Sequence, residues 1–146
     1  MNGSSQSAVF ILNSTGTTTN YTSTLSLYLH DNSIQNMPNA QLSGFEIDNG
    51  ANAGDNGALF VDLGTNTAPG GNSASLPVAL FTALSLTTNG GAGIATNVYK
   101  YTGAANDSTA IQNYITSVNG SLSPPPAVGA FTGTTQGTTT SPTFPS

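Results

Sequence analysis

The chain has 146 residues, a length that suits one domain with a single core. It carries one Lys or Arg, six Asp or Glu and one His, for a formal net charge of −5. Nucleic acids and anionic membrane surfaces are therefore excluded as partners, because proteins that bind them rely on clustered basic residues. Charged residues make up 5% of the chain, against about a quarter in an ordinary domain. We expect a subunit covered by copies of itself or by another protein, or an extracellular one.

The N-terminal region contains no feature of a targeting segment. It starts at Met1 without a basic segment, and its apolar run at residues 8–12 is short, so we expect no secretion signal. No stretch reaches the roughly 18 apolar residues of a membrane span. The chain has no cysteine, which excludes disulfides and thiolate metal sites.

Alternating apolar and polar residues predict a half-buried strand at residues 21–30, with Leu25, Leu27 and Leu29 on one face. Tyr28 breaks the pattern, because it lies on the face that is otherwise polar. Further strands are predicted at residues 8–12, 45–47, 58–63, 76–86 and 96–102. Asn-Gly pairs between these runs favour hairpin turns. The predicted fold class is all-β, a single antiparallel β-sandwich or jelly-roll-like domain.

Residues 107–120 depart from this pattern and predict one short helix. Asp107 or Ser108 can cap its first amides, and Asn119 with Gly120 suits a left-handed C-cap. Apolar residues recur at helical spacing along the segment, at Ile111, Tyr114, Ile115 and Val118.

The C-terminal residues 121–146 are rich in Pro, Thr, Gly and Ser, which predicts an extended arm. The predicted organisation is an N-terminal arm at residues 1–7, the β-domain at residues 8–120, and this C-terminal arm. We favour an arm that reaches a neighbouring subunit over one that straps its own domain. The candidate assembly residues on it are Pro124, Pro125, Pro126, Val128, Phe131 and Phe144.

The stretch DNGANAGDNG at residues 48–57 is a weak candidate calcium loop, with Asp48, Asn52 and Asp55 as ligands. An EF-hand loop also needs a Gly at its sixth position and a Glu at its twelfth, and both are missing here. Turns in which Asp and Asn bind their own backbone are the favoured interpretation. We therefore predict no metal and no cofactor.

Candidate catalytic groups are sparse. His30 beside Asp31 could join a serine in a triad, and Glu46 with Asp48 could form a carboxylate pair for glycoside hydrolysis. A lone surface histidine and a pair of carboxylates on one strand face are, however, common without any activity. We expect a protein that is not an enzyme.

The predicted function is a structural subunit of a large assembly, such as a capsid decoration (cement) protein of a tailed-phage virion. Its expected partners are copies of itself, in a homo-oligomer, and a major capsid or other scaffold protein. One alternative is a subunit of an extracellular filament or surface layer that exchanges a strand or arm with its neighbour. A second alternative is a carbohydrate-binding or adhesive module, for which the possible sugar platforms are Tyr21, Tyr28, Tyr99 and Tyr101.

Overall fold

The computed structural model describes residues 9–14, 22–35, 43–75, 82–91, 93–119, 122–129 and 133–139. The strands of the first half are β1 (Val9–Asn13), β2 (Ser23–Tyr28), β3 (Ser33–Ile34), β4 (Phe45–Asn49), β5 (Gly57–Asp62) and β6 (Ser73–Ser75). The second half contains β7 (Leu84–Thr88), β8 (Ala95–Tyr99), the helix α1 (Ser108–Val118), β9 (Leu122–Ser123), β10 (Ala127–Gly129) and β11 (Thr134–Thr138).

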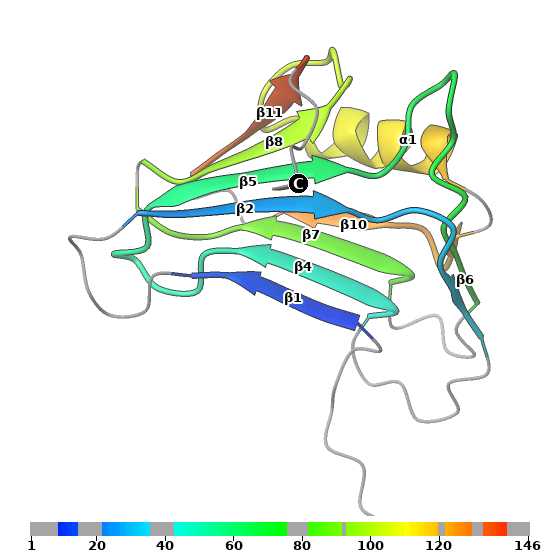
Figure 1. The fold of residues 1–146 in the computed structure, drawn as a ribbon, viewed down its shortest axis with the longest axis horizontal. Coiled ribbons are helices and arrows are strands. Elements are labelled where there is room, and N and C mark those ends of the chain that lie inside the picture. Colours follow the sequence, from blue (N-terminus) through cyan, green and yellow to red (C-terminus); the bar gives the residue numbers. More distant parts are fainter. Residues whose placement is uncertain are drawn as a thin grey trace, which may run out of the picture.

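The strands form three parallel sheets, because consecutive strands enter different sheets. The first sheet has the order β1-β4-β7-β10, the second β11-β8-β5-β2, and the third β3-β6-β9. The chain therefore coils as a parallel β-solenoid, in which each full turn places one strand in each sheet (Figure 1). Helix α1 is inserted into the third turn, between β8 and β9.

The predicted antiparallel β-sandwich or jelly-roll-like domain is wrong, because the paired strands run parallel in all three sheets. Alternation of apolar and polar residues indicates which side chains face inward, but it does not indicate whether the neighbouring strand runs parallel or antiparallel. The Asn-Gly pairs at residues 49–50, 56–57 and 89–90 lie between strands of different sheets, so they do not form hairpins between paired strands. At the first of these pairs Gly50 has a φ of 87°, and its N–H donates to the Asn13 carbonyl of the preceding turn at 2.7 Å.

The predicted strand positions are nevertheless close to the observed ones. Residues 8–12, 45–47, 58–63 and 96–102 overlap β1, β4, β5 and β8, and residues 21–30 contain β2. The predicted strand at residues 76–86 contains the start of β7, while residues 76–81 lie outside the described residues.

The core consists of apolar side chains stacked from turn to turn. Phe45 of β4 pairs with Leu84 of β7, and Ile47 pairs with Leu86; all four are fully buried. Each such burial contributes about 1.5–3 kcal/mol relative to an exposed side chain. The same cluster includes residues of the second sheet and of α1, among them Leu59, Val61, Val98, Ile111 and Ile115.

Polar side chains also stack inside the solenoid, at the corner between the first and second sheets. The Asn13 amide donates to Asn49 Oδ1 at 2.8 Å, and the Asn49 amide donates to the Ala95 carbonyl at 2.8 Å. Between the next two turns the Thr88 hydroxyl of β7 lies 2.6 Å from the Thr135 hydroxyl of β11. Among the described residues, no buried side-chain polar atom lacks a partner. These hydrogen bonds join successive turns where water is excluded.

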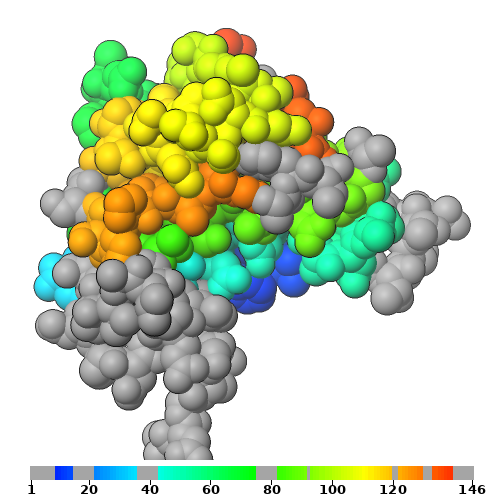
Figure 2. All heavy atoms as spheres, turned by 180° about the vertical axis from the view of Figure 1, so that it is seen from behind, coloured from blue at the N-terminus to red at the C-terminus, as the bar shows by residue number. Residues whose placement is uncertain are grey.

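Helix α1 begins as predicted and ends differently. The Asp107 carboxylate accepts a hydrogen bond from the Ala110 N–H at 2.9 Å, which confirms the predicted N-cap. Asn119 is extended, with a φ of −112°, so this residue is not in the predicted left-handed conformation, and Gly120 lies outside the described residues. Its side chain instead donates to the Ile115 carbonyl at 2.8 Å. In the view from behind, α1 and the segment leading to it cover the upper part of the face, and the loop after β5 projects beyond them (Figure 2).

The start of the predicted C-terminal arm belongs to the solenoid. Strands β9, β10 and β11 pair in parallel with β6, β7 and β8, so residues 122–138 contain three strands where an extended arm was expected. Val128 is buried in the core, and the Pro124 carbonyl accepts a hydrogen bond from the Ala83 N–H at 3.1 Å. Pro125 is exposed and Pro126 is buried. Phe131, Phe144 and the predicted N-terminal arm at residues 1–7 lie outside the described residues.

Candidate functional site

A groove with a volume of about 520 Å³ lies where β2, β5 and β8 end. The strand ends form its floor, the loop after β5 forms one wall, and α1 contributes Tyr114. The described residues that line it are Tyr28, His30, Asp62, Thr65, Asn66, Thr67, Ala68, Tyr99, Lys100 and Tyr114.

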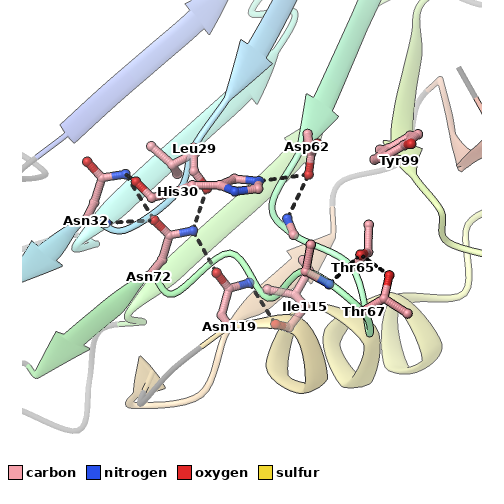
Figure 3. Close-up of polar contacts among 12 residues, drawn as sticks. Leu29, His30, Asn32, Asp62, Thr65, Thr67, Asn72, Tyr99, Ile115 and Asn119 are labelled. Atoms are coloured by element: carbon pink, nitrogen blue, oxygen red, sulfur yellow. Dashed lines mark hydrogen bonds and ion pairs between the residues drawn. The ribbon is translucent and has the colours of Figure 1, made fainter. Parts of the chain in front are cut away.

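Three groove residues come from successive turns and form a row along the solenoid axis. Tyr28 of β2 pairs in register with Asp62 of β5. Val61 pairs with Val98, so the next residues, Asp62 and Tyr99, also lie side by side. Figure 3 shows Asp62 between His30 and Tyr99. The parallel register therefore brings together residues that are far apart in the sequence.

Tyr28 points outward because the residues on either side of it point inward. Leu27 packs against the core and Leu29 is buried, whereas Tyr28 is 54% exposed. Its ring stacks on that of His30, with 3.7 Å between the centroids. The break in alternation that the sequence shows at Tyr28 thus marks an aromatic ring displayed on the groove.

His30 and Asp62 form a hydrogen-bonded contact in the groove. The distance from His30 Nε2 to Asp62 Oδ1 is 2.9 Å, and the same oxygen accepts the Gly64 N–H at 2.8 Å. The partner of His30 is therefore Asp62, in place of the Asp31 of the candidate triad. No Ser or Thr hydroxyl in the described part of the chain binds the His30 ring, so the structure does not assemble that triad. The contact holds the imidazole in place on the groove floor.

The wall of the groove is a tight loop at residues 65–68. The Thr65 N–H donates to the Ala68 carbonyl at 2.8 Å, and the Thr65 and Thr67 hydroxyls lie 3.2 Å apart. The loop starts at Gly64, whose φ is 106°; a Cβ there would lie 2.0 Å from the Gly70 nitrogen. Glycine is therefore required for the close return of the chain. The loop presents hydroxyl and amide groups, with Asn66 and Thr67 exposed.

Tyr114 fastens α1 to the groove. Its hydroxyl lies 2.7 Å from the Tyr99 carbonyl and 3.1 Å from the Gly64 carbonyl. Burial, followed by the nearby Asp62 carboxylate and Tyr99, raises the pKa of Tyr114 to about 12. The phenol is thus protonated at neutral pH and donates a hydrogen bond to a carbonyl.

Lys100 occupies the rim of the groove directly after β8. It is exposed, its φ is 62°, and its ammonium nitrogen lies 5.4 Å from the centroid of the Tyr99 ring. That distance is within the range of a cation–π contact. The groove therefore combines three tyrosine rings, the His30–Asp62 contact, neutral polar groups and one exposed ammonium group.

The candidate calcium ligands have other roles in the structure. Asp55 is buried, and its Oδ2 accepts hydrogen bonds from the Ala51 and Asn52 N–H groups and from the Ser14 hydroxyl, at 2.6, 2.9 and 2.8 Å. The self-bonded turn favoured from the sequence is thus present at Asp55. Asp48 lies on β4, where the Thr87 hydroxyl donates to it. The described residues contain no group of three or more His, Cys, Asp or Glu placed to hold a metal.

Asp48 and Glu46 lie two residues apart on β4 and are both half-buried. Burial raises the pKa of Asp48, the Thr87 hydrogen bond lowers it, and Glu46 raises it further. Neither residue lines the groove. The candidate carboxylate pair is therefore on the first sheet, away from the hollow in which a sugar could sit.

Two of the four candidate sugar platforms, Tyr28 and Tyr99, lie in the groove. Tyr101 is 6% exposed, and its hydroxyl donates to the Ala104 carbonyl at 2.9 Å, so it belongs to the core. Tyr21 lies outside the described residues. Sequence reasoning did not identify Asp62 or Tyr114 as groove residues, because only the parallel register and the position of α1 place them there.

No protein-family model, curated protein or solved structure matches this chain. The described part of the chain contains no helix that is long and apolar enough to cross a membrane.

Proposed function

We propose that the chain is a non-catalytic saccharide-binding module whose ligand lies in the groove. The observation that carries this proposal is the row formed by Tyr28, Asp62 and Tyr99 on three successive turns. A sugar ring has apolar C–H faces and a rim of hydroxyl groups. It is therefore recognised by aromatic faces together with fixed hydrogen-bonding groups.

The groove contains both kinds of group in a fixed arrangement. Tyr28 and Tyr99 offer the rings, and the loop at residues 65–68 offers hydroxyl and amide groups beside them. The loop is held by its own hydrogen bonds, and Asp62 is held by His30 and Gly64. Groups that are already fixed lose little conformational entropy when a ligand binds.

The spacing of the row favours an extended ligand. Neighbouring strands in a sheet lie about 4.8 Å apart, so the groove residues repeat at this interval along the axis. A saccharide chain aligned with the axis contacts one turn after another. Among the described residues the groove contains one carboxylate, Asp62, whereas glycoside hydrolysis canonically uses a pair, which favours binding over hydrolysis.

A glycan microarray, followed by calorimetry with the best ligand, tests this proposal. Tyr28→Ala and Tyr99→Ala are each expected to weaken binding at least about tenfold, which corresponds to about 1.4 kcal/mol. Phe10→Ala is the matched control, because Phe10 is 56% exposed but lies on β1, away from the groove. Binding that survives both groove substitutions, or that Phe10→Ala weakens equally, contradicts the proposal.

A structural subunit of a large assembly is the second candidate. Its support is the edge strand β1, on which Phe10 and Leu12 are 56% and 42% exposed. Among the described residues β1 pairs only with β4, and an unpaired edge is a template for another chain. We propose the virion as its setting, with a major capsid or other scaffold protein as partner, and an extracellular filament as the alternative setting.

Light scattering with Phe10→Ser and Leu12→Ser tests this second candidate. If β1 mediates assembly, the double variant is monomeric at concentrations where the parent chain associates. Identical association of parent and variant excludes this edge as the contact.

A further inference from the structure

Both side chains of this protein that can carry a positive charge, apart from the N-terminus, lie in the same groove. The 146 residues include one Lys or Arg, which is Lys100, and one His, which is His30. Both of them are among the described residues that line the groove. Of the six carboxylates, the groove contains Asp62 alone. The groove therefore differs in charge from the rest of an acidic molecule.

The Asp62 carboxylate is less accessible to a ligand than the Lys100 ammonium group. The Asp62 side chain is 7% exposed, and one of its oxygens accepts hydrogen bonds from His30 and Gly64. Lys100 is exposed, and no carboxylate of the described residues forms an ion pair with it. The charge that a ligand meets at the rim is thus positive.

The backbone at Lys100 gives independent support. In the described part of the chain three non-glycine residues have positive φ, and two of them, Asp31 and Asn106, are of types that tolerate this conformation. Lys100, with a φ of 62°, is not of such a type. Its N–H donates to the Thr138 carbonyl at 2.8 Å, which fixes the residue at the strand end beside Tyr99. A non-glycine residue held at positive φ beside a groove is an observation from which a functional role can be proposed.

We infer that the groove selects saccharides that carry an anionic substituent, a carboxylate or a sulfate, and that Lys100 is the specificity-determining residue. The inference rests on the proposed saccharide-binding function. The ligand's ring lies against Tyr28 and Tyr99, and its anionic group lies at the Lys100 ammonium. A neutral saccharide makes the ring contacts alone.

Matched polymer pairs test the inference on the full chain by affinity electrophoresis and calorimetry. Polygalacturonate is compared with its methyl ester, and dextran sulfate with dextran, so that each pair differs in charge on one backbone. At least one charged polymer is expected to bind about tenfold tighter than its neutral partner, the increment typical of a hydrogen bond to a charged group. Whether the carboxylate or the sulfate pair shows the difference identifies the anionic group.

Lys100→Asn removes the charge while keeping a residue that tolerates positive φ, and Lys100→Arg keeps the charge. Lys100→Asn should abolish the preference for the charged polymer without changing neutral binding, and Lys100→Arg should preserve it. Equal binding of both members of each pair, or a preference that survives Lys100→Asn, overturns the inference and leaves the saccharide-binding function intact. If polyglutamate binds as tightly as the charged saccharide polymer, the ligand class is an acidic peptide and the saccharide assignment is overturned. If the parent chain binds no saccharide, both proposals fail. Equal melting temperatures of the parent and Lys100→Asn show that the variant is folded.

Discussion

The substitution Asn72→Ala should be among the most destabilising single changes in this chain. Asn72 is fully buried and joins three turns of the solenoid (Figure 3). Its amide donates to the Leu29 carbonyl at 2.6 Å and to Asn119 Oδ1 at 2.7 Å. Its oxygen accepts the Asn32 N–H at 3.2 Å and the Asn32 amide at 3.0 Å.

The expected loss of stability follows from the polar groups that the substitution leaves without a hydrogen-bond partner. The Leu29 carbonyl and the Asn119 oxygen each lose a donor, the Asn32 N–H and amide lose their acceptor, and an unsatisfied buried polar group costs about 1–3 kcal/mol. Asn32 and Asn119 are half-buried and can recruit water, so we expect a total loss of about 2–4 kcal/mol in the free energy of unfolding. For a chain of this size that corresponds to a decrease in Tm of about 6–12 °C.

Urea unfolding followed by far-UV circular dichroism measures this loss. Asn66→Ala is the matched control, because Asn66 is exposed at the tip of the loop after β5 and should change stability by less than about 0.5 kcal/mol. Equal unfolding midpoints for Asn72→Ala and Asn66→Ala, with unchanged m-values, would refute the claim that the hydrogen-bonded asparagines 32, 72 and 119 hold the turns together.

Three further predictions concern titration and metals. The free energy of unfolding should fall as pH rises from about 10 to 12, because folded Tyr114 keeps its proton above the pKa of an unfolded tyrosine. In an absorbance titration of tyrosinate, Tyr114→Phe should remove the component that titrates at the highest pH. Protonated Asp48 stabilises the fold, so its contribution is full below the unfolded pKa of 3.8 and is lost as pH rises through the higher folded pKa. At neutral pH that contribution is absent, and Asp48→Asn should therefore melt no lower than the parent. EDTA should leave Tm unchanged, because three donors already satisfy Asp55 Oδ2, and a decrease that calcium restores would show a metal site.

The local elements could be predicted from the sequence, because they depend on neighbouring residues. The helix start at Asp107 follows from a capping side chain and the helical spacing of Ile111 and Ile115. The inward face of β2 follows from the alternation of Leu25 and Leu27. Each of these signals lies within one turn of the solenoid.

The pairing of the strands could not be predicted from such local signals. Antiparallel and parallel strands share the same alternation, and an Asn-Gly pair can turn a corner as well as a hairpin. A repeat was present but irregular: the stacked asparagines are 36 residues apart at Asn13 and Asn49, 40 at Asn32 and Asn72, and 47 at Asn72 and Asn119. The last interval is lengthened by the insertion of α1. A search for internal repeats is the step that addresses this signal.

The candidate site was predicted in part for the same reason. Tyr28 and Tyr99 stand out as aromatic residues at strand positions, and both line the groove. Asp62 and His30 become neighbours only through the parallel pairing of β2 with β5. Their relation depends on the register, which no single strand encodes.

The most direct test of the proposed saccharide-binding function is an amide NMR titration of the labelled chain with the saccharide that binds best on the array. We predict shifts at residues 28–30, 62–68 and 99–100, which line or flank the groove, and unchanged signals at residues 46–48 and 85–87 of the first sheet. Shifts confined to the first sheet, or no shifts at saturating saccharide, would contradict the proposed function.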